Sequence, residues 1–521
     1  MNRRMRHALT TAVALMGLGA VGCTDTSVNP LSTVSEVNIF SNPAAYQQFL
    51  AKVYGGLAVT GQQGPAGNRD ISSITDEGFS SYLRIYWEMQ ELPTDEAIIG
   101  WGDQGLPELN TATWGSANRF VAGMFSRVYF QIGMANEFLR QTTDAKLSER
   151  KVTPSVRATV QQYRAEARFL RAFSYWHGLD FWGNIPVVTT IQASPPAQNT
   201  RQEVYDFIVS ELTAIQADLP AAGPGTYGRA TKEAASMLLA NVYLNAEVYT
   251  GTPHYAEALV AAQAAINGPF SIDPTYQNMF LADNNNSPEI IFPVVQDGQH
   301  TQSYGAVTFI THASCGASMS NVTYGLDGCW WGIRLKPEAY NLFAAGDARS
   351  GFFYTSGQTV AINNIGDFTN GIAAPKFQNV TSTGAPGSNS QFADTDWPVF
   401  RLAEAYLIYA EAAVRTNTNL VQALAYVNAL QDRAFGAGNN TLTAPQLTLQ
   451  FLLDERGREL LWEGHRRTDL IRFGVFSGGT YLWAWKGNVQ AGTATDAHLD
   501  LFPIPATEIS ANPNLKQNTG Y

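Results

Sequence analysis

The chain has 521 residues, of which 45% are hydrophobic, 12% aromatic and 15% charged. This composition excludes a disordered, collagen-like or coiled-coil protein, and the length is sufficient for several domains or one large domain with its own core. The 33 basic and 44 acidic residues leave a net charge of −11, which argues against a nucleic-acid partner.

The first 22 residues have the layout of a bacterial signal peptide. Arginines cluster before His7, a run of small, apolar and hydroxyl residues follows, and Gly22 directly precedes Cys23. The run is too short to span a hydrocarbon core of roughly 30 Å comfortably, and small residues before a cysteine suit cleavage and lipid attachment. We therefore expect a signal peptide over residues 1–22, a lipidated Cys23 and a linker over residues 23–38. An ordinary secreted protein is the alternative.

The other two cysteines, Cys315 and Cys329, lie in a stretch rich in Gly, Ser and Asn. An exported protein folds in an oxidising compartment, so we expect a disulfide between them. Closing a loop of about 15 residues in this way can stabilise a fold by about 3 kcal/mol. A metal site is the alternative, but His312 is the single histidine nearby and such a site needs more ligands.

Helical periodicity dominates residues 39–283, which we expect to form a helical region. Between Ser155 and Leu179, apolar residues recur at intervals of three and four with arginines between them. Two further segments each predict a pair of helices: Ala230 to Ile266, and Arg401 to Ala434 with a break at residues 416–419. Paired helices with small residues at their contacts are typical of tetratricopeptide-like stacking. An irregular helical bundle is the alternative.

Residues 284–396 differ in character, with many Gly, Asn, Ser and Thr residues and short apolar runs such as Ile290 to Phe292. We predict a loop-rich, ligand-binding insertion that carries short strands, because long loops in compact proteins are usually functional. Residues 397–521 predict helices from Val399 to Phe473 and an extended tail from Leu501 that packs back on the helical region. The predicted fold class is therefore all-α.

Catalysis by paired carboxylates has five candidates: Asp95, Glu96, Glu455, Glu459 and Glu463. The last three are spaced by four residues with arginines nearby, which favours a salt-bridged helix face over a glycosidase pair. The sequence has no phosphate-binding loop, zinc-protease motif or serine-hydrolase motif, and its seven histidines form no metal pattern. A single carboxylate-lined Ca²⁺ site stays open. We expect no enzyme activity, no metal and no cofactor.

Aromatic residues near predicted loops are the better functional candidates. They form two groups: Tyr82, Tyr86, Trp87 and Trp101 around Thr94 to Glu96, and Tyr304, Tyr324, Trp330 and Trp331 in or beside the predicted disulfide loop. Sugar rings stack on Trp and Tyr faces while their hydroxyls bind polar groups at the rim. The pattern predicts a carbohydrate platform, and ordinary core packing is the alternative for each residue.

Several motifs resemble the SusD/RagB family of outer-membrane nutrient-uptake lipoproteins. They are Ala165 to Phe173 followed by Phe181 to Pro186, Gly228 to Lys232, Arg401 to Leu407 with Ala410 to Ala412, Glu455 to Arg472, and the tail from Pro503 to Tyr521. The matches run in order from about Asn42 to the last residue. Their ion pairs and prolines belong to a scaffold, so none of these motifs has to touch a ligand.

The resemblance implies an all-α protein with tetratricopeptide-like helix pairs that is anchored by lipid to the outer membrane and faces outward. It implies a non-catalytic role, in which the protein binds an oligosaccharide or polysaccharide and delivers it to a SusC-like TonB-dependent transporter. The loop after Asp95 matches the family in position, which makes Trp101 and Asp103 the first candidates for ligand binding. Capture of peptides or another nutrient, a helical glycoside hydrolase and a purely structural scaffold are the alternatives.

Overall fold

The computed structural model describes residues 39–521, apart from residues 62–63, 66–68 and 191–193. The predicted signal peptide, Cys23 and the linker up to residue 38 lie outside these residues. Residues Tyr46 to Tyr521 form one compact unit, and the first unit, Met1 to Ala45, is described only from residue 39. Within the described part of the chain, none of the helices has the length and apolar character needed to cross a bilayer.

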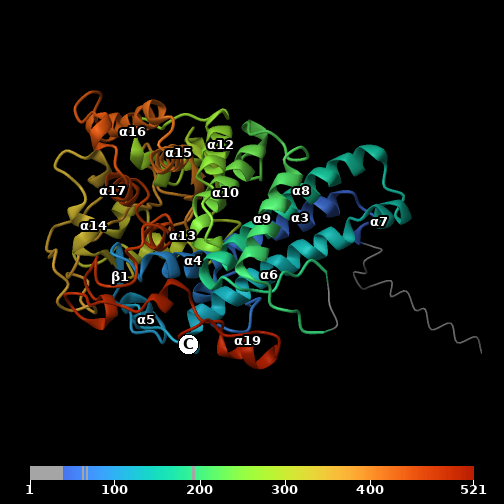
Figure 1. Cartoon of the computed structure of the whole chain (residues 1–521), viewed down its shortest axis with the longest axis horizontal. Helices are drawn as coiled ribbons and strands as arrows, with labels where there is room; N and C mark the ends of the chain where they lie inside the picture. Colours follow the sequence, from blue (N-terminus) through green and yellow to red (C-terminus); the bar gives the residue numbers. More distant parts are fainter. Residues whose placement is uncertain (1–38, 62–63, 66–68, 191–193) are drawn as a thin grey trace, which may run out of the picture. The chain divides into compact units, whose positions relative to one another are not determined.

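Helices form most of the regular structure (Figure 1). In chain order they are α3 (Ala44–Ala58), α4 (Tyr82–Glu91), α5 (Leu106–Thr111), α6 (Arg119–Gln141), α7 (Asp144–Glu149), α8 (Pro154–Trp182), α9 (Arg201–Ile215), α10 (Lys232–Leu244), α11 (Ala246–Thr250), α12 (Tyr255–Ile266), α13 (Ala306–Ala313), α14 (Pro337–Asn341), α15 (Leu402–Thr416), α16 (Leu420–Phe435), α17 (Leu449–Glu459), α18 (Arg466–Arg472) and α19 (Ala506–Ala511). The strands of the described residues are β1 (Ala97–Ile99), β2 (Ile290–Val294), β3 (Ile333–Leu335) and β4 (Trp397–Arg401).

Local sequence explains where the long helices begin and end. The Asn118 side chain accepts the Phe120 and Val121 N–H groups at 3.0 and 3.2 Å, which caps α6. Helix α8 begins with Pro154, whose fixed φ suits a first helical position, and ends at Gly183, where φ is 71°. These signals set the ends of the two longest helices.

The helices pack against one another in two groups. Helix α8 lies between α6 and α9, and α12 lies between α10 and α15, which in turn packs against α16. Buried alanines such as Ala234, Ala258 and Ala412 let the second group approach closely, and Tyr406 stacks on Tyr426 with ring centroids 4.2 Å apart. The predicted all-α class with tetratricopeptide-like helix pairs is confirmed, although α10 ends at Leu244 and a short α11 follows it.

Two small antiparallel strand pairs connect the insertion, residues 284–396, to the rest of the chain. Strand β1 pairs with β3, and β2 pairs with β4, so each ladder joins one strand of the insertion to one outside it. The prediction that helical order resumes at Val399 is wrong, because β2 recruits residues 397–401 as β4 and the helix begins at Leu402. The insertion also contains the helices α13 and α14 among its loops.

A buried ion-pair network joins β4 to α17. Arg401 donates to Glu463 at 2.6 Å, to Glu289 at 2.9 Å and to Glu459 at 2.6 Å. The sequence predicted one salt-bridged helix face, but α17 ends at Glu459. Glu463 lies beyond the helix, just after Trp462, whose φ is 61°. Burial would raise the pKa of Glu463, but Arg401 and Lys376 outweigh burial and hold this pKa below its ordinary value. Glu289, Glu459 and Glu463 therefore have a structural role, and we call these buried ion pairs the frame.

The C-terminal tail returns to the end of α8. The Phe502 N–H donates to the Phe181 carbonyl at 2.7 Å, and the Asn518 amide donates to the carbonyls of Trp182 and Phe502 at 3.0 and 2.8 Å. The tail was expected to be extended throughout, but residues 506–511 form α19, whose first N–H bonds to the Ser116 carbonyl at 2.9 Å.

Candidate functional site

The β1–β3 ladder brings two tryptophan-bearing segments together. Where the ladder continues beyond β1, the Gly100 N–H donates to the Gly332 carbonyl at 2.9 Å. Trp101 comes next after Gly100, and Trp330 lies two residues before Gly332, so the two tryptophans meet. The indole N–H of Trp101 donates to the carbonyl of Trp330 at 3.1 Å.

Three aromatic rings from distant parts of the chain follow one another at this place. Ring centroids lie 6.4 Å apart between Trp101 and Trp330, and 6.4 Å apart between Trp330 and Tyr304. We call these three residues the aromatic row, and all of them are half-buried. Trp331, next along the chain, is 52% exposed, and its ring centroid lies 6.1 Å from that of Phe368. Three of the predicted ligand-binding residues thus come together, and a fourth, Trp331, is next to one of them in the chain.

The inner side of Trp101 rests on helices α4 and α13. Its ring meets Phe309 edge-on with centroids 5.8 Å apart, and the Arg84 guanidinium lies 5.5 Å from the Trp101 ring and 4.2 Å from the Phe309 ring. Arg84 donates to Glu88 at 2.9 Å. Burial raises the pKa of Glu88 to about 7, against the opposing effect of Arg84. Trp101 is therefore held by packing on one side.

Trp330 is supported by His312 at the end of α13. The two ring centroids are 4.6 Å apart, with 31° between the ring planes. The His312 ring is fixed in turn, because its Nδ1 lies 3.0 Å from the Thr308 carbonyl and its Nε2 lies 3.3 Å from the Asp327 carboxylate. From the sequence, His312 was a candidate only for a metal ligand, because its contact with Trp330 depends on the fold.

Polar groups lie around the aromatic row. Asp103 is half-buried two residues after Trp101, and Asp327 is exposed beside the support of Trp330. The exposed Gln391 donates to the Tyr304 hydroxyl at 3.1 Å. Sequence reasoning missed Gln391, because no motif links it to a tyrosine so far away in the chain. The surface thus combines flat apolar faces with hydrogen-bonding groups.

Tyr324 does not belong to the aromatic row. It lies in a short 3-10 helix (Asn321–Tyr324) and is half-buried against a small core. The buried members of this core are Cys315, Met319, Leu326, Phe368 and Ala373. Its main role in the structure is to pack the loop from inside.

The aromatic residues of α4 lie in the main core. Tyr82 and Trp87 are 1% and 0% exposed, and Tyr86 is also buried. The Tyr82 hydroxyl lies 2.8 Å from Nδ1 of His177, and the Trp87 indole donates to the Trp462 carbonyl at 3.1 Å. Their expected place on a ligand platform is wrong, because α4 is buried on every side.

The acidic pair that precedes the Trp101 segment belongs to the frame as well. Asp95 accepts two bonds from Arg466, both at 2.7 Å, and one from the Tyr481 hydroxyl at 2.6 Å. Burial would raise the pKa of Asp95, but Arg466 overcomes this and lowers it. Glu96 is also buried, with an oxygen that accepts the Trp462 N–H at 3.0 Å. Both carboxylates are buried, at 0% and 1% exposure.

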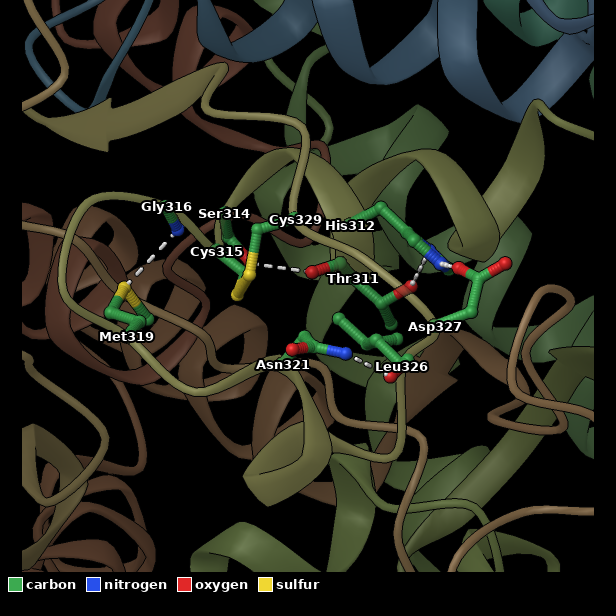
Figure 2. Close-up of a disulfide and its surroundings, with 10 residues drawn as sticks. All are labelled: Thr311, His312, Ser314, Cys315, Gly316, Met319, Asn321, Leu326, Asp327 and Cys329. Atoms are coloured by element: carbon green, nitrogen blue, oxygen red, sulfur yellow. Dashed lines mark hydrogen bonds and ion pairs between the residues drawn. A yellow bond between two sulfur atoms is a disulfide. The ribbon is translucent and has the colours of Figure 1, made fainter.

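A disulfide joins Cys315 and Cys329, whose Cα atoms are 4.9 Å apart (Figure 2). Cys315 is buried just after α13, and Cys329 directly precedes Trp330. Inside the closed loop, the Asn321 amide donates to the Leu326 carbonyl at 2.7 Å. The disulfide therefore joins the end of α13 to the residue directly before Trp330 of the aromatic row. Among the residues that the structure describes, no cluster of three or more His, Cys, Asp or Glu side chains is placed to hold a metal ion.

Two family models match the chain. One, described as the SusD family, matches residues 345–521, and the other, described as starch-binding and associating with the outer membrane, matches residues 46–244. The two matches lie on either side of the segment that carries Tyr304 and Trp330.

Curated relatives and solved structures agree with these matches. The starch-binding protein SusD of Bacteroides thetaiotaomicron is 34% identical, over 98% of this chain and 97% of that protein. The SusD-like protein P2 of Formosa agariphila is 26% identical, over 99% of this chain and 100% of that protein. The surface glycan-binding protein A of B. thetaiotaomicron, solved in complex with laminarihexaose, has the same fold, with a TM-score of 0.70 at 21% identity, over 91% of this chain and 98% of that one. The predicted family resemblance is confirmed, and the chain belongs to the SusD family.

Proposed function

We propose that this protein binds oligosaccharides or polysaccharides on the aromatic row and Trp331 without cleaving them. The observation that carries the proposal is the meeting of the half-buried rings of Trp101, Trp330 and Tyr304, with the exposed Trp331 following Trp330 in the chain. Flat aromatic faces suit the C–H faces of sugar rings, and nearby carboxylates and amides suit hydroxyl groups. This combination favours a glycan over a peptide.

The names of its relatives support a carbohydrate ligand. The relative that is 34% identical is called a starch-binding protein, and a structure of the same fold was solved with laminarihexaose. These two ligands are both glucose polymers, so glucans are the first class to test. We expect loop side chains to set the sugar length and linkage, because function in a shared fold is decided by the site rather than by the fold.

The buried carboxylates support binding without hydrolysis. A glycosidase needs two carboxyl groups facing each other across a substrate cleft. The acidic candidates Asp95, Glu459 and Glu463 are instead buried and paired with arginines. The protein therefore has the features of a capture surface, with binding energy from stacking and enough reversibility to release the sugar.

We also propose that the protein is lipid-anchored through Cys23, faces the cell exterior and passes its ligand to a SusC-like TonB-dependent transporter. Association with the outer membrane appears in the description of the family model that matches residues 46–244. Cys23→Ser should release the protein from the membrane fraction, whereas continued membrane association of this variant would contradict a lipid anchor at this residue.

Binding of the soluble form, starting after Cys23, tests the glycan proposal. We would titrate it with maltoheptaose, laminarihexaose and a peptide of similar size, using calorimetry, and assay reducing ends in parallel. Trp331→Ala should weaken glucan binding about tenfold, since an exposed stacking ring is lost. The matched control is Val421→Ala, which removes an 87% exposed apolar side chain from α16.

Equal affinity in the Trp331→Ala and Val421→Ala variants would contradict the aromatic surface as the binding site. Binding of the peptide but neither glucan would favour the peptide alternative. Steady release of reducing ends would favour the hydrolase alternative.

A further inference from the structure

The backbone of Trp331 has an uncommon conformation for a large residue. Its φ is 57°, in the left-handed region where the Cβ of a bulky side chain is crowded. The side chain is nevertheless 52% exposed, so burial of the ring alone does not hold this conformation. The surrounding chain must therefore hold it.

Three consecutive amides fasten this segment to the end of α13. Trp330 N–H donates to the His312 carbonyl at 2.9 Å, Trp331 N–H to the Cys315 carbonyl at 3.0 Å and Gly332 N–H to the Ala313 carbonyl at 2.8 Å. The acceptor of the Trp331 amide is thus a residue of the disulfide itself. These bonds require residues 312–315 to stay beside residues 330–332.

The disulfide enforces the same proximity by a covalent bond. Figure 2 shows the bond between Cys315 and Cys329. Cys329 is two residues before Trp331, and Cys315 supplies the carbonyl that binds the Trp331 amide. Trp330 has independent support, because its ring rests on His312 and its carbonyl accepts the Trp101 indole. The ring of Trp331 lies against Phe368, with centroids 6.1 Å apart, and its amide is bound by Cys315, so Trp331 is the tryptophan most directly tied to the disulfide.

We propose that the Cys315–Cys329 disulfide is a positioning element for Trp331, which presents the ring of Trp331 to the glycan before the ligand arrives. This inference rests on the proposed function, because it assigns the disulfide to the same surface. A ring ordered in advance loses less side-chain freedom when the ligand binds. Loss of the disulfide should therefore weaken glucan binding about threefold to tenfold.

The test compares four soluble proteins: the wild type, Cys315→Ser/Cys329→Ser, Trp331→Ala and the variant that combines all three substitutions. If the disulfide acts through Trp331, its removal should cost affinity in the wild type and much less in the Trp331→Ala background. An equal loss in both backgrounds, or no loss in either, would overturn the proposal.

Hydrogen exchange gives a readout that needs no ligand. In Cys315→Ser/Cys329→Ser, the amides of residues 330–332 should exchange faster, while those of α8 keep their protection and show that the fold is intact. Unchanged exchange at residues 330–332 would overturn the proposal. If the wild type binds no glucan, the proposed function fails, and the exchange result still decides whether the disulfide holds Trp331.

If the serine variant does not fold, the folded wild type is reduced with a water-soluble phosphine. Each phosphine takes up the oxygen of one water molecule, and the disulfide becomes two thiols. The same binding and exchange changes are then expected, with α8 protection as the internal control. Reduction that leaves both binding and exchange unchanged would overturn the proposal.

Discussion

His465 shows how a single buried residue ties stability to pH. Its Nδ1 lies 3.8 Å from Glu404, and both side chains are buried. Burial lowers the pKa of His465 to about 4, with a further lowering by Arg456, and burial raises the pKa of Glu404 to about 7. At pH 5.5 both groups are therefore mainly neutral in the folded protein.

This arrangement predicts a pH-dependent contribution of His465 to stability. As pH falls from 6.5 towards 4, the unfolded histidine binds a proton and the folded one does not, so the folded state loses stability. When pH falls from 7.5 to 5, titration of His465 should lower the unfolding free energy of the wild type by about 2 kcal/mol. The His465→Gln variant should not show this loss. Urea unfolding at several pH values measures this difference.

His300→Gln is the matched control, because His300 has an 81% exposed side chain. Its unfolding free energy should follow the wild type across the same pH range. A difference between the wild type and His465→Gln that stays constant with pH would contradict the role of His465.

At the scale of elements, Arg401 links β4 to the insertion and to the end of α17. It is paired with Glu289, Glu459 and Glu463, all buried. Removing Arg401 leaves these buried carboxylates only with Arg349, Arg433 and Lys376, so their charges are less fully compensated, which is more costly than losing an exposed ion pair. The network therefore holds together segments that are far apart in the chain.

Arg401→Met should lower the free energy of unfolding by about 3–5 kcal/mol, because three buried carboxylates lose a common partner. Arg140→Ala, which breaks an exposed pair with Glu137, should cost less than about 1 kcal/mol. Denaturant unfolding of both variants checks this contrast, and similar small losses in the two would show that the network contributes little.

The helical elements could be predicted from the sequence because their periodicity is local. The pattern from Ser155 to Leu179 lies inside α8, and the pairs α10 with α12 and α15 with α16 follow the predicted turns. The strands could not be predicted as closely, because β1 and β3 are short and their partners lie far apart along the chain. A three-residue strand carries little pattern of its own.

The candidate site shows the same division between local and distant information. Trp87 and Trp101 both lie near the Thr94 to Glu96 segment, but Trp87 is fully buried and Trp101 is half-buried. Their environments depend on α13 and the β1–β3 ladder, which the sequence does not reveal. The sequence pointed to the residues of the aromatic row as candidates, but it could not show which candidates meet or that His312 supports Trp330. Their binding of a sugar stays a prediction.

Across the whole molecule, the C-terminal tail is hydrogen-bonded to the end of α8. Asn518 is buried, and its side-chain amide binds the carbonyls of both Trp182 and Phe502. Because residues Tyr46 to Tyr521 form one compact unit, damage at this contact should affect the unit as a whole.

Asn518→Ala should destabilise the protein by about 1–3 kcal/mol, because two buried carbonyls lose a donor. Thermal unfolding followed by far-UV circular dichroism and by tryptophan fluorescence should show both signals shifting together to lower temperature. The control Asn285→Ala removes an exposed amide and should leave the midpoint unchanged. Two separate transitions in Asn518→Ala would contradict a single cooperative unit.

The β1–β3 ladder has a consequence for how such proteins can diverge. The residues Trp101 and Trp330 both lie close to the paired strands of this ladder, whereas the buried ion pairs of Arg401 lie in other elements. Insertions or deletions between residues 316 and 328 can therefore change the outline of the surface without moving the rungs or the helices. If the proposed function holds, a change of loop length is therefore expected to change which glycan fits, and grafting this loop from one relative into another tests that expectation.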